Sequence, residues 1–169
     1  LNLDVEKIYK YVSVIKTLDG TITEVEEKTV DDLLSLKKEA MPQKLFNGDI
    51  VFNPYRINTG SIIYIDSEED NLITSPAYVV LRNLDINAKY LIQLLKTPFM
   101  KYQIQVLASG SVRDNFSSNG LKELKIPNLS ENEQKEKINI VNNTIDKINK
   151  QTKEIENNID FINKVLNEF

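Results

Sequence analysis

Two polar stretches of the chain contain residue types that can contact the edges of nucleic-acid bases. In the first stretch, Arg56 can pair with two acceptors of guanine, Asn58 can pair with adenine, and Thr59 adds a hydroxyl. The relevant members of the second stretch are Ser109, Gly110, Ser111, Arg113 and Asn115. Its glycine lets the backbone approach a phosphate, to which hydroxyls and a guanidinium can donate. We predict that both stretches contact a duplex, with Arg82 and Lys101 as further contacts.

For each of these residues the alternative is a solvated loop position without a ligand. Phe116, which follows the second stretch, is interpreted as an anchor in the core rather than as a side chain that stacks on a base.

The composition excludes most catalytic chemistry. The chain contains no histidine and no cysteine, so it has no Cys nucleophile, no His base and no zinc site of the usual kind. We therefore expect neither an enzyme nor a bound metal or cofactor. The formal net charge of −4 argues against non-specific binding to phosphates, but residues 41–129 are close to neutral and leave room for a local basic face.

Cysteine content, apolar stretches and the first residue indicate the compartment of the chain and whether it belongs to a longer protein. The lack of cysteine and of a signal peptide favours the cytoplasm, and no stretch is apolar enough for a membrane span. Because the first residue is Leu1 rather than Met, we expect a fragment or internal domain of a longer protein.

Asn53-Pro54-Tyr55 resembles the Asn/Asp-Pro-Pro-Tyr/Phe motif of adenine amino-methyltransferases, in which a side chain and a prolyl carbonyl accept from the target amine. One proline is missing here, and neither a glycine-rich cofactor loop nor a βαβ alternation accompanies the motif. We therefore interpret the tripeptide as a proline turn after a strand.

The elements that must position the polar stretches belong to an α+β globule with a small, mostly antiparallel sheet. Period-2 patterns predict strands at residues 9–15, 21–25, 49–52, 61–65, 72–74 and 78–81, the first two forming a hairpin. Helical periods predict a short helix around residues 30–36, a second one capped by Asn87, and a third over residues 99–107. A polar loop at residues 108–119 and a return to the core at residues 121–127 complete the globule.

A long amphipathic helix is predicted after the globule. Ser130 and Glu133 have the spacing of a capping box at its start. Its apolar seam follows a heptad repeat through Ile138, Val141, Ile145, Ile148, Thr152, Ile155, Ile159, Ile162, Leu166 and Phe169. We predict a coiled-coil helix over residues 130–169 that pairs beyond residues 1–129; the alternative is a helix packed on its own domain.

Several sequence fragments, taken in order, resemble the DNA specificity subunit of type I restriction-modification systems. These fragments are Leu45-Phe46-Asn47-Gly48-Asp49-Ile50, Tyr55-Arg56, Thr59-Gly60-Ser61, Ser75-Pro76-Ala77-Tyr78-Val79-Val80, Gly110-Ser111-Val112-Arg113, Leu121-Lys122-Glu123-Leu124-Lys125-Ile126-Pro127 and Glu133-Gln134. The order of these fragments before a terminal coiled-coil helix carries the resemblance.

The resemblance implies a target recognition domain at residues 1–129 that reads one half of a split DNA sequence, followed by a conserved spacer helix. It implies double-stranded DNA, methyltransferase subunits and a restriction subunit as partners, with the helix paired to a second copy or to the second half of the same parent subunit. Two other interpretations stay open. One is a coiled-coil oligomerisation or adaptor protein without DNA binding, and the other is the C-terminal recognition domain of a fused DNA adenine methyltransferase.

Overall fold

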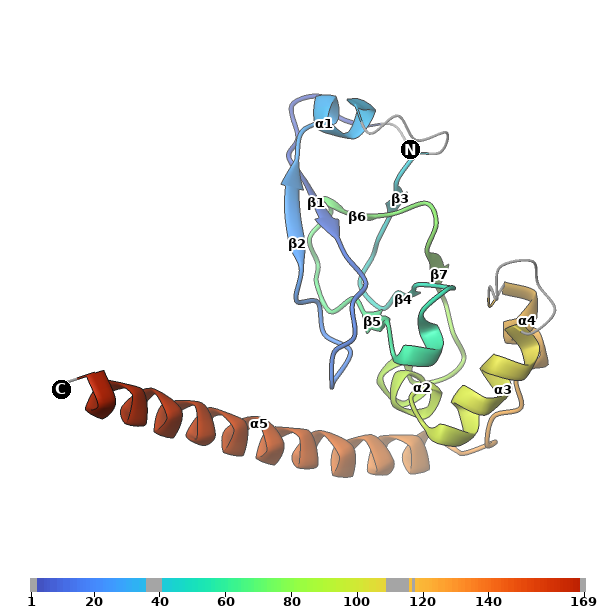
Figure 1. The fold of residues 1–169 in the computed structure, drawn as a ribbon. Helices are drawn as coiled ribbons and strands as arrows, with labels where there is room; N and C mark the ends of the chain where they lie inside the picture. Colours follow the sequence, from blue (N-terminus) through green and yellow to red (C-terminus); the bar gives the residue numbers. More distant parts are fainter. Residues whose placement is uncertain (1–2, 36–40, 109–115, 117, 168–169) are drawn as a thin grey trace.

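The strands of the protein form two small sheets. The computed structural model describes residues 3–35, 41–108, 116 and 118–167 (Figure 1). The first sheet, in the order β2-β1-β6-β3, consists of β1 (Tyr9–Val12), β2 (Val25–Lys28), β3 (Gln43–Lys44) and β6 (Leu72–Thr74). The second, in the order β5-β4-β7, consists of β4 (Ile50–Phe52), β5 (Ile62–Tyr64) and β7 (Val79–Leu81). Only β1 with β6 is a parallel pair among these. The α+β class is confirmed, although the strands are divided between two sheets instead of one.

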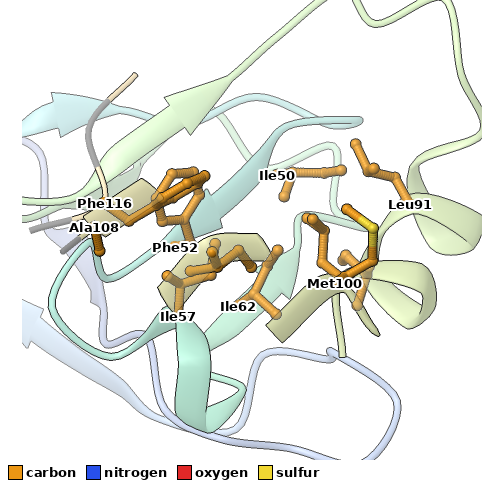
Figure 2. Close-up of a cluster of buried hydrophobic side chains, with 11 residues drawn as sticks. Ile50, Phe52, Ile57, Ile62, Leu91, Met100, Ala108 and Phe116 are labelled. Atoms are coloured by element: carbon orange, nitrogen blue, oxygen red, sulfur yellow. The ribbon is translucent and has the colours of Figure 1, made fainter. Parts of the chain in front are cut away.

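The central strand of the second sheet is covered on both faces. Ile50 and Phe52 belong to a core shared with the helices, whereas Val51 belongs to a core shared with the first sheet. Alternate side chains of a strand point to opposite faces, so β4 joins the two cores. Figure 2 shows the core on the helical side, with Ile50, Phe52, Ile57, Ile62, Leu91, Met100, Ala108 and Phe116 labelled.

Short helices close the globule on one side of the second sheet. They are the 3-10 helix η1 (Ile57–Thr59), α2 (Ala88–Leu95), α3 (Pro98–Ala108) and α4 (Ser118–Glu123). The Asn87 side chain caps α2, as predicted, by accepting a hydrogen bond from the Tyr90 amide at 3.0 Å. The loop predicted at residues 108–119 is wrong at its end, because α4 begins at Ser118. Gly120 has a low helix propensity, so the sequence did not predict this helix. Glycine suits this position because a Cβ there would lie 2.9 Å from the Phe116 ring.

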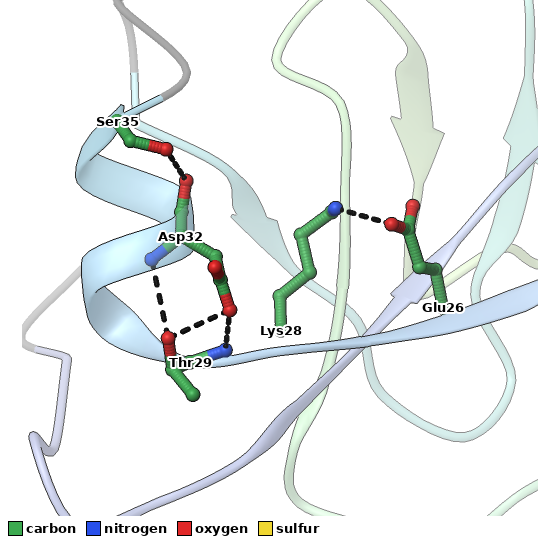
Figure 3. A network of polar contacts seen from close by, with 5 residues as sticks. All are labelled: Glu26, Lys28, Thr29, Asp32 and Ser35. Atoms are coloured by element: carbon green, nitrogen blue, oxygen red, sulfur yellow. Dashed lines mark hydrogen bonds and ion pairs between the residues drawn. The ribbon is translucent and has the colours of Figure 1, made fainter.

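The predicted N-terminal hairpin is present with a shifted second strand. β2 begins at Val25, so residues 21–24 are not a strand, and its exposed side chains suit the edge of a sheet. The helix α1 (Val30–Ser35) follows. Its start is fixed by Asp32, whose carboxylate accepts hydrogen bonds from the Thr29 amide at 2.8 Å and the Thr29 hydroxyl at 2.7 Å (Figure 3). These bonds lower the pKa of Asp32.

The long helix α5 (Glu131–Asn167) begins with the predicted capping box. The Glu133 carboxylate accepts from the Ser130 amide at 2.8 Å, and the Ser130 hydroxyl accepts from the Glu133 amide at 3.4 Å. Gln134 fastens the helix to the globule, because its amide group donates to the Leu129 carbonyl at 2.9 Å and accepts from the Asn87 amide at 2.9 Å.

Only the first part of the seam packs on the globule. Ile138 and Ile145 are buried and Val141 is half-buried beside α2. The later described seam residues Ile148, Thr152, Ile155, Ile159, Ile162 and Leu166 are all exposed, and Figure 1 shows this part of α5 extending away from the globule. Phe169 lies outside the described residues. The interpretation of a helix packed on its own domain therefore holds for residues 138–145 and fails after them.

Candidate nucleic-acid interface

Three elements meet around a groove on the helical side of the globule. The loop between β1 and β2, the end of η1 and the junction of α2 with α3 enclose about 350 Å³. The residues that line this groove are Lys16, Thr17, Leu18, Thr59, Gly60, Gln93, Lys96 and Lys101. We call the cluster of Lys16, Lys96 and Lys101 the lysine pocket. Each of its cations comes from a different element.

Lys96 is the most constrained of the three cations. Its half-buried ammonium donates to the carbonyl of Thr17 at 2.9 Å and to that of Leu18 at 3.3 Å. Burial lowers the pKa of Lys96 to about 8; the nearby Asp19 carboxylate acts in the opposite direction, and the charge of Lys101 adds to the lowering. Burial disfavours the charged form of an amine, and a second cation does the same.

The loop that supplies Lys16 is held in one conformation against α2. Gly20 has φ of +88°, and a Cβ at this position would lie 2.9 Å from the buried Ile92 side chain. The Gly20 amide donates to the Thr17 hydroxyl at 2.9 Å, and the Gln93 amide group donates to the Leu18 and Asp19 carbonyls at 3.3 Å. Glycine is required where a positive φ and a close approach coincide.

The first predicted stretch lies beside this groove. Arg56 precedes η1, and Arg56, Asn58 and Thr59 are exposed. The Thr59 hydroxyl donates to the Arg56 carbonyl at 2.7 Å, which leaves the hydroxyl oxygen available only as an acceptor. The structure thus brings Thr59 and the half-buried Lys101 to one groove, with Arg56 and Asn58 on the adjacent turn.

Asn53-Pro54-Tyr55 forms the predicted turn after a strand. The Asn53 side chain accepts from the Tyr55 amide at 3.0 Å, and the Pro54 carbonyl accepts from the Phe116 amide at 3.0 Å. The two groups that would receive a target amine in a methyltransferase motif therefore already stabilise the turn and its contact with Phe116. The interpretation as a proline turn is confirmed.

Residues 109–115, and with them Ser109, Gly110, Ser111, Arg113 and Asn115, lie outside the described residues. The residues on either side of this stretch are placed: Ala108 and Phe116 are buried and line a second cavity of about 190 Å³ together with Tyr55 and Asn58. The described residues that flank the second stretch thus lie beside the first stretch. Phe116 is 1% exposed, with its ring centroid 6.2 Å from that of Phe52, so its interpretation as a core anchor is confirmed.

Arg82 lies in a different environment from the other predicted contacts. Its Nε and Nη2 donate to the two carboxylate oxygens of Asp49, both at 2.7 Å, and the guanidinium stacks 4.4 Å above the centroid of the Phe46 ring. Asp49 is fully buried, and its hydrogen bonds raise the pKa of Arg82. The structure shows a role for Arg82 in the fold, while its contact with DNA stays a prediction.

Comparison with known proteins identifies the architecture. No known family model and no curated protein sequence matches the chain. Among solved structures, the chain is similar to the HsdS subunit from Thermoanaerobacter tengcongensis, with a TM-score of 0.68 and 19% identity over 87% of this chain. The chain has the fold of a type I specificity subunit.

A second solved structure supports the same fold. It concerns the complex assembly and conformational transition of a type I R-M system and matches with a TM-score of 0.51 and 18% identity over 89% of this chain. The present chain spans 38% of the length of each of these two proteins. The predicted resemblance is therefore confirmed for the fold.

Lys16 and Lys96 were not among the contacts predicted from the sequence. The two residues are 80 positions apart, and each looks like an ordinary surface lysine in its local sequence. Only the docking of the β1–β2 loop on α2 brings them together.

Within the part of the chain that the structure describes, no helix combines the length and the apolar character that crossing a membrane requires.

Proposed function

We propose that this chain is a sequence-specific DNA recognition module of a type I restriction-modification complex. Residues 1–129 read one half of a bipartite target, and residues 130–169 set the spacing to a second recognition globule and dock methyltransferase subunits. The fold shared with HsdS over 87% of the chain is the observation that carries this proposal. We expect the chain to act without cofactor or catalytic residues of its own, in the cytoplasm.

The exposed part of α5 supports a helical partner. Ile155 is 59% exposed, Ile159 51% and Leu166 66%, although all three continue the seam that Ile138 and Ile145 bury against the globule. An apolar stripe of this length is stabilised when a second helix covers it. A second copy of the chain, or the second half of a longer subunit, supplies that helix, and Thr152 helps to fix its register.

The exposed η1 turn supports the assignment of the DNA-facing side. Among the described residues, Arg56 makes no ion pair. The side-chain amide of Asn58, on the same turn, offers the acceptor and the donor that match the edge of adenine. Arg56 and Asn58 are the base-reading residues of this proposal, and Thr59, Lys101 and the residues predicted from the 109–115 stretch are its further DNA contacts.

The decisive experiment for recognition is selection from random duplexes by this chain together with methyltransferase subunits. An enriched half-site, and its loss in Arg56→Ala and Asn58→Ala variants, is the expected result. Indifference of the complex to duplex sequence would refute the proposal. It would favour the adaptor interpretation, in which the helix alone carries the function.

The role of the helix is tested by light scattering. The variant Ile155→Asp/Ile159→Asp is expected to lose pairing, because two carboxylates would face the partner seam. The control Asn143→Asp/Asn157→Asp adds the same charges at exposed positions on the face of the helix opposite the seam and is expected to pair as the parent does. If the parent and both variants are monomers, the second half of a longer subunit is the partner.

A further inference from the structure

We propose that the lysine pocket binds a backbone phosphate of duplex DNA beside the bases read from η1. This inference rests on the proposed function and adds Lys16 and Lys96 to the interface. The pocket would fix the position of the duplex, while Arg56 and Asn58 would distinguish its bases, since phosphate contacts position and base contacts specify.

The groove carries an unbalanced positive charge. Lys16, Lys96 and Lys101 line one groove, and Asp19, which lies near Lys96, is the nearby carboxylate. Asp19 already accepts hydrogen bonds from the Thr21 amide at 3.0 Å and the Thr21 hydroxyl at 2.8 Å. In the part of the chain that the structure describes, none of the three lysines forms an ion pair. An anion in the groove would relieve the repulsion among them.

The groove offers several hydrogen-bond donors to an anion. A lysine ammonium has three N–H donors, and Lys96 directs two of them to the carbonyls of Thr17 and Leu18. One donor of Lys96 therefore stays available, as do the ammonium groups of Lys16 and Lys101. The Thr59 hydroxyl donates elsewhere, whereas the Thr17 hydroxyl accepts from the Gly20 amide and keeps its own O–H as a donor beside the lysines.

Contacts around the groove hold Lys96 and the loop that carries Lys16 in place. Lys96 donates to carbonyls of the same loop that carries Lys16. The aliphatic stem of Lys16 passes over Gly60, since a Cβ built on Gly60 would lie 3.6 Å from the Cγ of Lys16. The positive φ of +95° at Gly60 ends η1 at the wall of the groove. Phosphate bound here would meet the pre-positioned ammonium of Lys96 and lie next to the turn that carries Asn58.

The proposal is tested by measuring the affinity of the complex for its selected duplex and for an unrelated duplex at several salt concentrations. Lys16→Ala and Lys101→Ala are each expected to weaken binding to both duplexes by about tenfold near 0.1 M salt and to reduce the slope of log affinity against log salt by about 0.9. The control Lys10→Ala removes one positive charge from β1, where Lys10 pairs with Glu69, and is expected to leave the slope unchanged.

A pH series adds a test specific to Lys96. Because its pKa lies at about 8, duplex affinity is expected to fall between pH 7 and 9 as Lys96 loses its proton. The Lys96→Arg variant keeps its charge over this range and is expected to lose this pH dependence. Asp19, Lys16 and Lys101 are the charged groups around it.

The outcomes separate this inference from the proposed function. Sequence-selective binding by the parent, with affinity and salt slope unchanged in the pocket variants, would overturn the pocket alone. Binding of inorganic phosphate by the parent, without any effect of the variants on duplex affinity, would also overturn it. Failure of the parent complex to select any duplex would overturn the proposed function and the pocket with it.

Discussion

Replacing Arg82 by Met tests whether this arginine stabilises the fold through its ion pair with the buried Asp49. The side chain of Asp49 is 1% exposed and accepts from Arg82 twice at 2.7 Å and from the Phe46 amide at 2.9 Å. Arg82 also donates to the Lys44 carbonyl at 3.1 Å. These contacts join β3, the turn before β4 and the end of β7.

The expected cost follows from what the substitution leaves behind. Methionine preserves much of the packing over Phe46 but removes two charge-assisted hydrogen bonds, each worth about 1.5–3 kcal/mol. Breaking a buried pair from one side typically costs about 3–5 kcal/mol because a carboxylate is left without its counterion. The Arg82 side chain is 42% exposed, so water can reach the vacated position, and we expect a loss of about 3 kcal/mol in the free energy of unfolding.

The measurement is thermal and urea unfolding of the parent and its variants. A loss of about 3 kcal/mol corresponds to a fall in Tm of roughly 6–12 °C for a chain of this size. Arg56→Met is the matched control, because it removes an exposed guanidinium and is expected to change stability by less than about 0.5 kcal/mol while weakening DNA binding. A Tm for Arg82→Met equal to that of the parent would refute the argument.

Three further predictions concern backbone conformation, capping and protonation. Gly20→Ala is expected to destabilise the protein by about 2 kcal/mol, seen as a lower urea midpoint, because of its φ of +88° and the contact with Ile92; an unchanged midpoint would contradict this. Ser130→Ala is expected to cost about 1 kcal/mol in thermal unfolding, whereas Ser130→Asp should retain most of the cap. The folded-state pKa of Lys96, about 8, lies below its ordinary value of 10.5, so between these values the unfolded chain binds more protons and stability rises with pH. Partial solvation reduces the gain to about 1–2 kcal/mol, and Lys96→Met should lack this rise.

Local sequence signals predicted most elements of the fold for identifiable physical reasons. Asn87 and the Ser130/Glu133 pair satisfy amide groups within one turn, so their sequence spacing is sufficient to locate the helix starts. Alternation likewise placed β4 and β5. The parallel pairing of β1 with β6 was not predicted, because it joins Lys10 with Leu72 across a long separation that no local period encodes.

The candidate site was only partly predictable for the same reason. Arg56, Asn58 and Thr59 are neighbours in the chain, so their chemistry could be recognised as a group. Lys16 and Lys96 become neighbours only after Gly20 allows the β1–β2 loop to pack on Ile92. The heptad seam shows a related limit: its period continues through Ile145 and Ile148, but one side chain is buried by the globule and the other is exposed.

Because of the environment of Lys96, we expect a rise in pH to increase the stability of the fold and to weaken phosphate binding. Raising the pH through about 8 removes a partly buried charge, which stabilises the folded globule and also removes a cation from the proposed phosphate site. A variant that only weakened the fold would shift both properties in the same direction. Measuring Tm and duplex affinity over the same pH series therefore distinguishes a direct role of Lys96 at the phosphate from a structural one. In the parent, we expect Tm to rise and duplex affinity to fall as the pH increases. In Lys96→Arg, we expect this divergence between the two curves to be lost.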